Sequence, residues 1–353
     1  MKKKFLSVVL SVAMAAALLV GCGSTGDSSS DTQTPAAEES TDTAAEGTDA
    51  TDASAEKGAD PADYKVVMVV KQSDSWFDDM ATGIEQLKKD TGLNVSVQVP
   101  ETGDAASQIS IMEDLIAQDV DALVPTIEKA REAGIVVVTH EAPGIADSVD
   151  LDVEAFVNET FGELFAEKLA TAMGGKGKYA GFVGGLTMET HMAWYDAAVS
   201  YLKANYPDME NVAEEPYEDG NSVEGAHDKA LEVLKAYPDI AGFFDCSAQG
   251  GGICEALQEN DLGGTVKVVS LALPSMSATY LKDGSMANGL CWRPADAGYA
   301  ACYAAYLIAS GQGVADGTDL KATGYESISL DGNVGYGNAP LEFTADNIDD
   351  YNF

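Results

Sequence analysis

The chain has 353 residues, of which 46% are hydrophobic, and this is enough apolar material for two domains with a core each. That content excludes a chain that is disordered throughout. The 58 acidic and 20 basic residues give a formal net charge of −38, which opposes binding to phosphate backbones and makes nucleic acid a poor candidate partner.

The first residues have the features of an export signal. Three lysines at 2–4 precede an apolar stretch over 5–20, which runs into Gly21 and Cys22. Together they resemble a bacterial lipoprotein signal, which is cleaved before a cysteine whose thiol then receives lipid. The alternative is an uncleaved anchor, but the apolar run is short for a membrane span. We therefore predict a signal peptide over 1–21 and lipidation of Cys22.

The segment that follows the signal has no means of folding by itself. Residues 23–62 are mostly Ser, Thr, Ala, Gly, Asp and Glu, and they contain no Leu, Ile, Val, Phe, Tyr, Trp or Met. Burial of such side chains cannot offset the entropy lost on ordering. We predict that 22–62 is a lipidated, disordered acidic linker.

From residue 65 the chain alternates short β-rich runs with amphipathic helical stretches, as in a parallel α/β layer. In the first half we expect strands at 66–70, 94–99, 122–124 and 135–139, with a helix that ends near Gly92 and another around 109–116. Only residues 125–134 remain for the last crossover, which is near the lower limit for a βαβ return. We expect a helix of about two turns there.

A linking segment near 142–149 separates this half from a second one with the same alternation. Its expected elements are, in order, helix 155–173, strand 179–183, helix 192–205, strand 211–217, helix 223–236, strand 240–244, helix 252–260 and strand 266–271. A shorter, mixed part follows, with helix 295–310, strand 325–330 and a tail over 343–353.

Catalytic and cofactor motifs give no positive signal. The chain has no phosphate-binding loop, no nucleophile elbow and no zinc-binding histidine pair, and Glu255 replaces the last glycine of a dinucleotide fingerprint after Gly250. Four cysteines other than Cys22 form no CxxC motif. We expect them to be small buried hydrophobic residues, and any pairing is left open.

Polar and aromatic side chains gather directly after the predicted strands. Ligands bind at these positions in open parallel sheets, and aromatic faces beside hydrogen-bonding groups suit a sugar ring with apolar faces and a hydroxyl rim. Each of these residues taken alone has an ordinary structural explanation, so the interpretation as a ligand-binding site rests on the whole set. Its members are Lys71, Gln72, Ser73, Trp76, Phe77, His140, Glu141, Thr190, His191, Trp194, Asp245, Ser247, Gln249, Trp292 and Arg293.

Over 64–353 the chain resembles the type I periplasmic binding proteins of sugar ABC transporters, in the branch of autoinducer-2 and rhamnose binders. The segments that carry the resemblance are Val69-Val70-Lys71 with Trp76-Phe77, the run 130–141, Thr190-His191 with Trp194, Leu273-Pro274-Ser275, 292–298 and 347–353.

The resemblance implies a fold and its boundaries. The fold is α/β, with two doubly wound parallel-sheet lobes joined by a three-segment hinge that crosses near 142–149, 289–293 and 330–340. The N-terminal lobe then comprises 63–143 and 292–332, and the C-terminal lobe comprises 144–291 and 333–353.

The resemblance also implies ligand contacts. Lys71 and Glu141 match contact positions of the first lobe, although aspartate is usual where Glu141 stands. Cys246 and Ala248 occupy positions where autoinducer-2 binders have Pro and Ala, and the pair 190–191 replaces their Asp-Gln. We therefore carry over the class of small hydroxylated ligand and no named sugar. The full set of candidate ligand-binding residues is Lys71, Ser73, Trp76, Phe77, Glu141, Thr190, His191, Trp194, Cys246, Ser247, Ala248, Trp292 and Arg293.

We expect a lipid-anchored solute-binding protein on the outer face of a bacterial cell membrane, of the Gram-positive type, that delivers a monosaccharide or autoinducer-2-like ligand to an ABC importer permease. We expect no enzymatic activity, cofactor, metal or nucleic-acid partner, and membrane contact through the lipid only. One alternative is a surface sensor that presents the sugar to a receptor kinase. Another is a sugar-modifying lipoprotein that uses Glu141 with His140 or His191.

Overall fold

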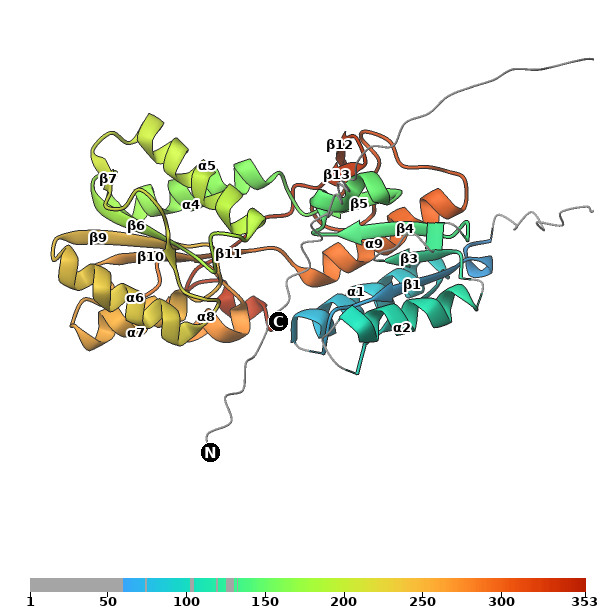
Figure 1. The fold of residues 1–353 in the computed structure, drawn as a ribbon, viewed down its shortest axis with the longest axis horizontal. Helices are drawn as coiled ribbons and strands as arrows, with labels where there is room; N and C mark the ends of the chain where they lie inside the picture. The colour runs from blue at the N-terminus through green and yellow to red at the C-terminus, as the bar shows by residue number, and fades with distance from the viewer. Residues whose placement is uncertain (1–59, 74, 102–104, 119, 125–129, 132) are drawn as a thin grey trace, which may run out of the picture. The chain divides into compact units, whose positions relative to one another are not determined.

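The computed structural model describes residues 60–353 except 74, 102–104, 119, 125–129 and 132 (Figure 1). The predicted signal peptide, Cys22 and nearly all of the linker lie outside the described residues, as does most of the short crossover over 125–134. Within the described residues no helix is both long and apolar enough to cross a membrane.

The first sheet has seven described strands, and all of its neighbouring strands are parallel except β12 and β13. In spatial order the strands are β12 (Ser329–Asp331), β13 (Val334–Tyr336), β5 (Leu151–Glu154), β4 (Val136–His140), β3 (Ala122–Val124), β1 (Lys65–Val69) and β2 (Asn94–Gln98).

The second sheet is also mostly parallel, and its antiparallel pair is β11 with β14. In spatial order its strands are β14 (Leu341–Phe343), β11 (Asn288–Cys291), β10 (Lys267–Leu271), β9 (Ile240–Asp245), β6 (Gly177–Val183) and β7 (Met209–Asn211), while β8 (Tyr217–Glu218) also pairs with β6.

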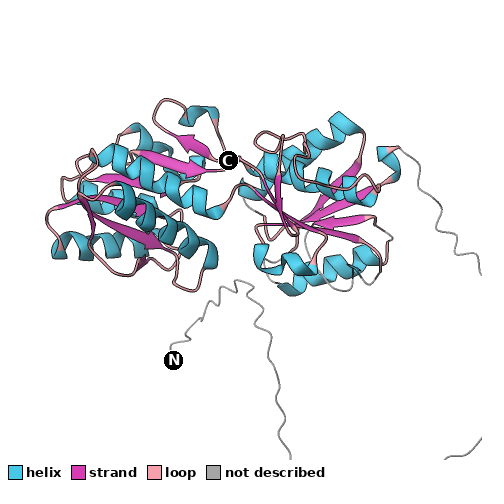
Figure 2. Cartoon of the chain, turned by 90° about the horizontal axis from the view of Figure 1, so that it is seen from above, coloured by secondary structure: helices cyan, strands magenta, loops and turns pink. Residues whose placement is uncertain are grey.

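Helices flank the strands of each sheet on both sides (Figure 2). Helices α1 (Ser75–Thr91), α2 (Ala105–Ile116) and α9 (Pro294–Ala309) accompany the first sheet. The second sheet has α4 (Asn158–Met173), α5 (Glu189–Asn205), α6 (Val223–Ala236), α7 (Gly250–Glu259) and α8 (Pro274–Lys282). Short 3₁₀ turns lie at Pro61–Asp63, Pro143–Ser148 and Ile348–Asp350.

Strand β1 shows why the first sheet is covered on both faces. Its side chains alternate, so that Val66 and Met68 join the core formed with α1, whereas Val67 and Val69 pack with the buried Met112 of α2. A strand buried on both faces reads as a continuous apolar run, which is how this segment was recognised in the sequence. The expected α/β fold with two parallel-sheet lobes is confirmed, and we call the first sheet with α1, α2 and α9 the first lobe and the second sheet with α4–α8 the second lobe.

Helices α1 and α9 approach each other through small residues. A Cβ atom on Gly83 would lie 1.8 Å from the backbone oxygen of Ala295. Alanines make up half of the buried residues of α9. The close contact therefore depends on the absence of larger side chains.

The chain passes between the sheets three times, and the first crossing differs from our expectation. We expected it near 142–149, but that segment contains a 3₁₀ turn and returns to β5 in the first sheet. The first crossing is therefore at 155–157, and residues 144–154 do not belong with the second sheet. The other crossings, at 292–293 and 337–340, lie within the expected ranges 289–293 and 330–340, but the expected lobe boundary after residue 332 is wrong, because β13 (Val334–Tyr336) pairs with β5 in the first sheet.

Several short elements also differ from the sequence-based prediction. The single strand expected over 211–217 is two short strands, β7 and β8, that both pair with β6. The strand expected over 325–330 begins only at residue 329, and α8, β11, β13 and β14 were not predicted. The four cysteines of the described residues, Cys246, Cys254, Cys291 and Cys302, are buried, as expected, and they are unpaired.

Candidate functional site

Lys71 and Glu141 lie at the same edge of the first sheet. Lys71 follows β1 and Glu141 follows β4, with only β3 between the two strands, which places the chain segments about two strand spacings of roughly 4.8 Å apart. Both residues are exposed, as is Ser73. Two opposite charges at a shared edge can donate to and accept from one bound molecule.

Glu141 occupies an unusual position. Its backbone has a φ of 57°, a left-handed conformation that is uncommon for residues other than glycine and is found disproportionately at functional sites. Burial raises the pKa of Glu141, His140 lowers it and Asp152 raises it, although the residue has access to solvent. A solvent-accessible carboxylate with protein on most sides has the surroundings expected of a recessed binding edge.

Two further carboxyl groups lie buried behind Glu141, on β5. Asp152 accepts a hydrogen bond from Thr139 Oγ1 at 2.6 Å through Oδ1, while Asp152 Oδ2 and Glu154 Oε1 have no hydrogen-bond partner. Burial raises the pKa of Glu154 to about 10, and the neighbouring Asp152 carboxyl group contributes to the rise. A proton on Glu154 that is donated to Asp152 would satisfy both oxygens.

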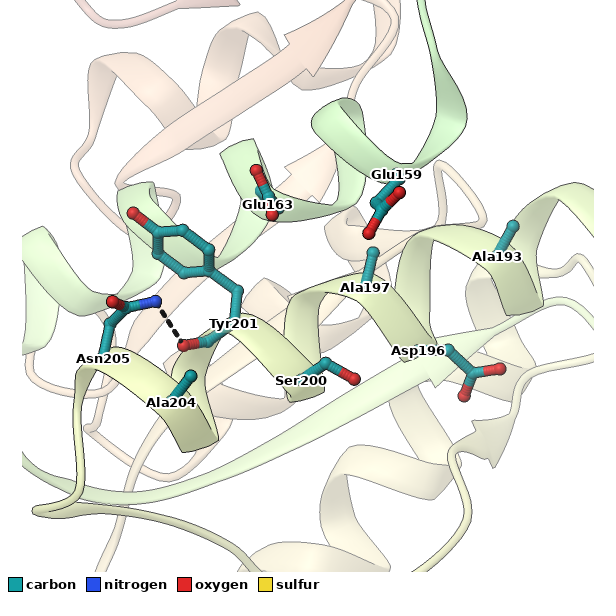
Figure 3. A pocket seen from close by; sticks show the side chains of 9 residues that line it. All are labelled: Glu159, Glu163, Ala193, Asp196, Ala197, Ser200, Tyr201, Ala204 and Asn205. Atoms are coloured by element: carbon teal, nitrogen blue, oxygen red, sulfur yellow. Dashed lines mark hydrogen bonds between the residues drawn. The ribbon is translucent and has the colours of Figure 1, made fainter.

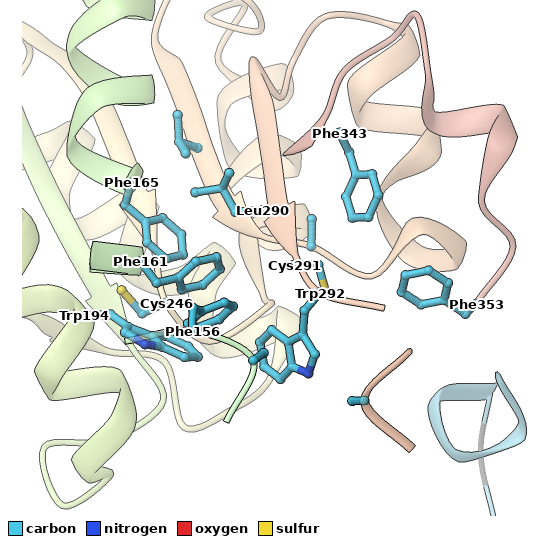
Figure 4. Close-up of a cluster of buried hydrophobic side chains, with 14 of the residues drawn as sticks. Phe156, Phe161, Phe165, Trp194, Cys246, Leu290, Cys291, Trp292, Phe343 and Phe353 are labelled. Carbon is cyan, nitrogen blue, oxygen red and sulfur yellow. The ribbon is translucent and has the colours of Figure 1, made fainter. Parts of the chain in front are cut away.

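An aromatic cluster joins residues from distant parts of the chain (Figure 4). The Trp292 ring meets Trp76 at 5.2 Å and Phe156 at 5.4 Å between centroids, both edge to face. Trp194 belongs to the same cluster, at 5.1 Å from Phe161. The three tryptophans predicted from the sequence are thus brought together, and Phe156, which follows the unpredicted strand β5, was missed.

The indole groups of Trp194 and Trp292 differ in their hydrogen bonding. Trp194 Nε1 donates to Asn158 Oδ1 at 2.7 Å, so this donor is already used within the second lobe. Trp292 is only 5% exposed, and its buried Nε1 has no partner. A buried indole N–H normally finds an acceptor. Trp292, unlike Trp194, therefore has a donor to spare.

His191, at the start of α5, supplies a neutral donor in the second lobe. Its ring stacks on Trp194 at 5.8 Å, and its Nδ1 accepts a hydrogen bond from Gly184 N at 3.2 Å. Burial lowers the pKa of His191 to about 4, so that the ring is neutral at pH 7. Because Nδ1 accepts, the proton sits on Nε2. Thr190 lies beside it and is half-buried.

The loop that contains Cys246, Ser247 and Ala248 follows β9 and is held by Asp245. The Asp245 carboxylate accepts backbone N–H bonds from Ser247 at 2.8 Å and from Gln249 at 2.8 Å. Cys246 is fully buried, and the Ser247 hydroxyl is occupied by neighbouring carboxyl groups. Ala248 has a φ of 66° and is half-buried, so it is the member of this trio with most access to solvent.

Two further predicted residues already have partners in the protein. Arg293 Nε lies 3.6 Å from Asp79 Oδ2, and the side chain lines a cavity of about 230 Å³ together with Asp296 and Glu326. Phe77 is partly buried and packs against the core that contains the aromatic cluster.

A larger hollow lies between α4 and α5 and contains none of the predicted residues (Figure 3). Its volume is about 490 Å³, and Glu159, Glu163, Asp196 and Tyr201 are among its lining residues. It is an acidic groove between two helices, away from the strand ends. Within the described residues no group of three or more His, Cys, Asp or Glu side chains is arranged to hold a metal ion.

Comparisons with known proteins agree with this architecture. A family model described as periplasmic binding protein domain matches residues 65–313. A sugar ABC transporter protein from Actinomyces odontolyticus superimposes with a TM-score of 0.75 at 24% identity, covering 83% of this chain and 99% of its own.

Two further solved structures come from clostridia. LsrB from Clostridium saccharobutylicum, in complex with AI-2, has a TM-score of 0.67 at 21% identity and covers 82% of this chain and 100% of its own. A solute-binding protein from Clostridium phytofermentas, with bound L-rhamnose, has a TM-score of 0.64 at 22% identity and covers 82% of this chain and 98% of its own. At these identities the likeness shows the fold. Since the family model spans well over half of the sequence, the chain belongs to the periplasmic binding protein family, whose members bind solutes and are not enzymes.

Proposed function

We propose that the protein binds a neutral, hydroxylated small molecule, a monosaccharide or an autoinducer-2-like compound, and delivers it to an ABC importer. The observation that carries this proposal is the placement of Lys71 and Glu141 at one sheet edge, each accessible to solvent. Aromatic rings and a neutral histidine donor accompany them in the chain. The AI-2 and L-rhamnose complexes of structural neighbours support the same ligand class.

The chemistry of these groups fits hydroxyl recognition. A lysine donates up to three hydrogen bonds, an ionised glutamate only accepts, and neutral His191 donates through Nε2. Sugar hydroxyls both donate and accept, so they can meet all three groups. The Trp76 and Trp292 rings supply apolar surface for the C–H faces of a sugar ring.

We propose further that the protein acts at the outer face of a bacterial cell membrane. Support comes from the basic residues 2–4, the apolar run over 5–20 and Cys22. A lipid on that cysteine and an acidic linker would hold the binding lobes near a permease.

Uptake of labelled ligand by a deletion strain distinguishes an importer component, whose loss abolishes uptake, from a sensor for a receptor kinase, whose loss leaves uptake intact.

A ligand screen tests the binding function. Residues 63–353 are heated with a panel of monosaccharides and AI-2, and a ligand at 100 times its Kd is expected to add about 2.7 kcal/mol to the unfolding free energy. The same sugar recovered unchanged after incubation excludes a modifying enzyme. If no member of the panel raises the melting temperature, the sugar assignment is wrong.

Two substitutions then test the site. Lys71→Ala and Glu141→Ala each remove a charged partner of a hydroxyl, worth about 1.5 to 3 kcal/mol, so we expect each to weaken binding roughly ten- to a hundredfold in titration calorimetry. Lys176→Ala and Glu210→Ala are matched controls, because both residues are exposed and neither follows a strand at the binding edge. Unchanged affinity in both site variants would move the site to the tryptophans of the aromatic cluster.

A further inference from the structure

A chain of four buried polar side chains links the ends of three strands in the second lobe. Asp219 follows β8, Asp245 ends β9, Ser247 follows it, and Ser270 lies in β10. All four are at most 6% exposed. We refer to them as the Asp219–Ser270 chain. It lies directly beneath the loop 246–248, which carries three of the predicted ligand-binding residues.

The hydroxyl groups of this chain each face two acceptors. Ser247 Oγ is within hydrogen-bonding distance of Asp219 Oδ2 and lies 2.6 Å from Asp245 Oδ1. Ser270 Oγ lies 2.8 Å from Asp245 Oδ2 and 2.5 Å from the backbone oxygen of Leu271.

The Ser247 hydroxyl has one proton for contacts with two carboxyl groups. If both aspartates were ionised, Ser247 could donate a full hydrogen bond to only one of them, and its other contact would bring lone pairs together in a buried site. A proton on one carboxyl group allows Asp219 to donate to Ser247 and Ser247 to donate to Asp245. The contacts of Ser247 therefore favour one protonated carboxyl group.

Within the described residues, no lysine, arginine or charged histidine is hydrogen-bonded to the Asp219 or Asp245 carboxyl group, and Lys229 of α6 pairs with Glu232 instead. The backbone N–H groups of Asn221, Ser247 and Gln249 donate to the carboxylates, and neutral His191 lies on the neighbouring α5. His227 of α6 is directed to Asp228 and Glu259 instead. The other titratable side chains around the chain are Cys246 in its own loop, Glu218 in β8, Tyr195 in α5, Glu224 in α6, and Cys254 and Glu255 in α7.

We propose that Asp219 is a positioning residue for ligand binding: through a proton shared with Asp245 by way of Ser247, it holds loop 246–248 in its binding conformation. The role in binding rests on the function proposed above. The loop needs such support because Ala248 has a left-handed backbone, which is unfavourable for alanine. When the proton leaves to solvent, two buried carboxylates repel each other across one hydroxyl, and the loop loses its attachment to Asp219.

The titration range of the pair makes this relevant near neutral pH. Burial raises the pKa of Asp219 from its ordinary 3.8 to about 7, and the neighbouring Asp245 raises it as well. Burial also raises the pKa of Asp245. Because the folded-state pKa is raised, the shared proton stabilises the fold at low pH, and that contribution is lost as the pH rises to about 7.

The variant Asp219→Asn tests the proposal. An asparagine amide donates to Ser247 Oγ without needing a bound proton, so the contact survives at every pH. Melting temperatures of wild type and variant are measured without ligand from pH 5 to pH 8.5. We expect the difference between them to grow in favour of the variant up to about pH 7 and then level off. Asp208→Asn is the matched control, since Asp208 is exposed, and its curve should parallel that of wild type.

The pH dependence of ligand affinity distinguishes a positioning role of Asp219 from a purely structural one, because a purely structural role would leave the affinity unchanged. With the ligand identified in the screen, wild-type affinity should fall about tenfold between pH 6 and pH 8, and that of Asp219→Asn by less than twofold. Ser247→Ala removes the bridge itself and should weaken binding at pH 6 as strongly as high pH does in wild type. If the melting temperatures of wild type and Asp219→Asn depend on pH in the same way, the proposal of a proton shared between Asp219 and Asp245 is wrong.

Equal pH dependence of affinity in wild type and Asp219→Asn would overturn the positioning role. A failure of the proposed function has a different signature. In that case no panel ligand binds wild type at any pH, while the ligand-free melting curves still decide whether the proton is present.

Discussion

Replacement of Glu154 by glutamine should make the protein more stable at neutral pH. In the folded protein the Glu154 pKa is raised from an ordinary value of 4.5 to about 10 by burial, with the neighbouring Asp152 carboxyl group adding to the effect. At pH 7 folding therefore requires uptake of a proton that the unfolded chain has released. The 2.5 pH units between 4.5 and 7 correspond to about 3 kcal/mol. Glutamine donates to Asp152 Oδ2 without proton uptake and avoids this cost.

The pH dependence is the sharper part of this prediction. Below pH 4.5 the glutamate is protonated in both folded and unfolded states, so wild type and Glu154→Gln should differ little. Between pH 4.5 and 10, wild type should lose about 1.4 kcal/mol per pH unit relative to the variant. At pH 7 the variant should melt about 6 °C higher, at roughly 2 °C per kcal/mol for a chain of this size.

Thermal melts followed by circular dichroism, in buffers with reductant from pH 4 to pH 8.5, measure this difference. The exposed Glu210 gives the control Glu210→Gln, which should follow wild type at every pH. A variant that is less stable than wild type at pH 7, or a difference that is the same at pH 5 and pH 8, would refute the shared proton on β5.

Three other outcomes are expected. Gly83→Ala should destabilise the first lobe by at least 2 kcal/mol in urea unfolding, because its Cβ would meet the backbone of Ala295, whereas Gly144→Ala, whose Cβ has 3.8 Å to its nearest neighbour, should be close to neutral. Cys22→Ala should move the protein from the membrane to the soluble fraction on cell fractionation, since the linker has no apolar surface of its own. Chains that start at residue 23 and at residue 63 should bind ligand with affinities within tenfold, or about 1.4 kcal/mol, in calorimetry.

The sequence predicted the fold because its main signals are local. Strand β1 is a continuous apolar run, and α6 begins and ends where its pattern predicts, at Val223 and Ala236, with Ser222 capping it by accepting the N–H of Gly225. Strand β5 escaped recognition because Leu151–Glu154 alternates apolar and acidic residues, which is typical of a strand with one face in water. Both acids are in fact buried, which only the tertiary structure shows.

The sequence predicted at which positions the candidate site residues lie. It did not predict which of their side chains are free to bind a ligand. Strand ends identify where Lys71, Glu141 and Ser247 lie along the sheet edges. Whether a group is free to meet a ligand depends on partners that are distant in sequence, such as Asp219, which lies 28 residues from Ser247 and uses its hydroxyl. The same holds for the Trp194 indole, which is satisfied by Asn158, 36 residues away.

The four buried thiols bear on the reversibility of unfolding. An extracytoplasmic protein meets an oxidising environment, and burial raises the pKa of Cys254 and of Cys302 to about 12, so the reactive thiolate is scarce while the fold persists. Unfolding exposes these thiols, and four cysteines can pair in three ways. Recovery of the native protein after heating should therefore depend on reductant, and outside the cytoplasm the lifetime of the protein is governed by how slowly it unfolds.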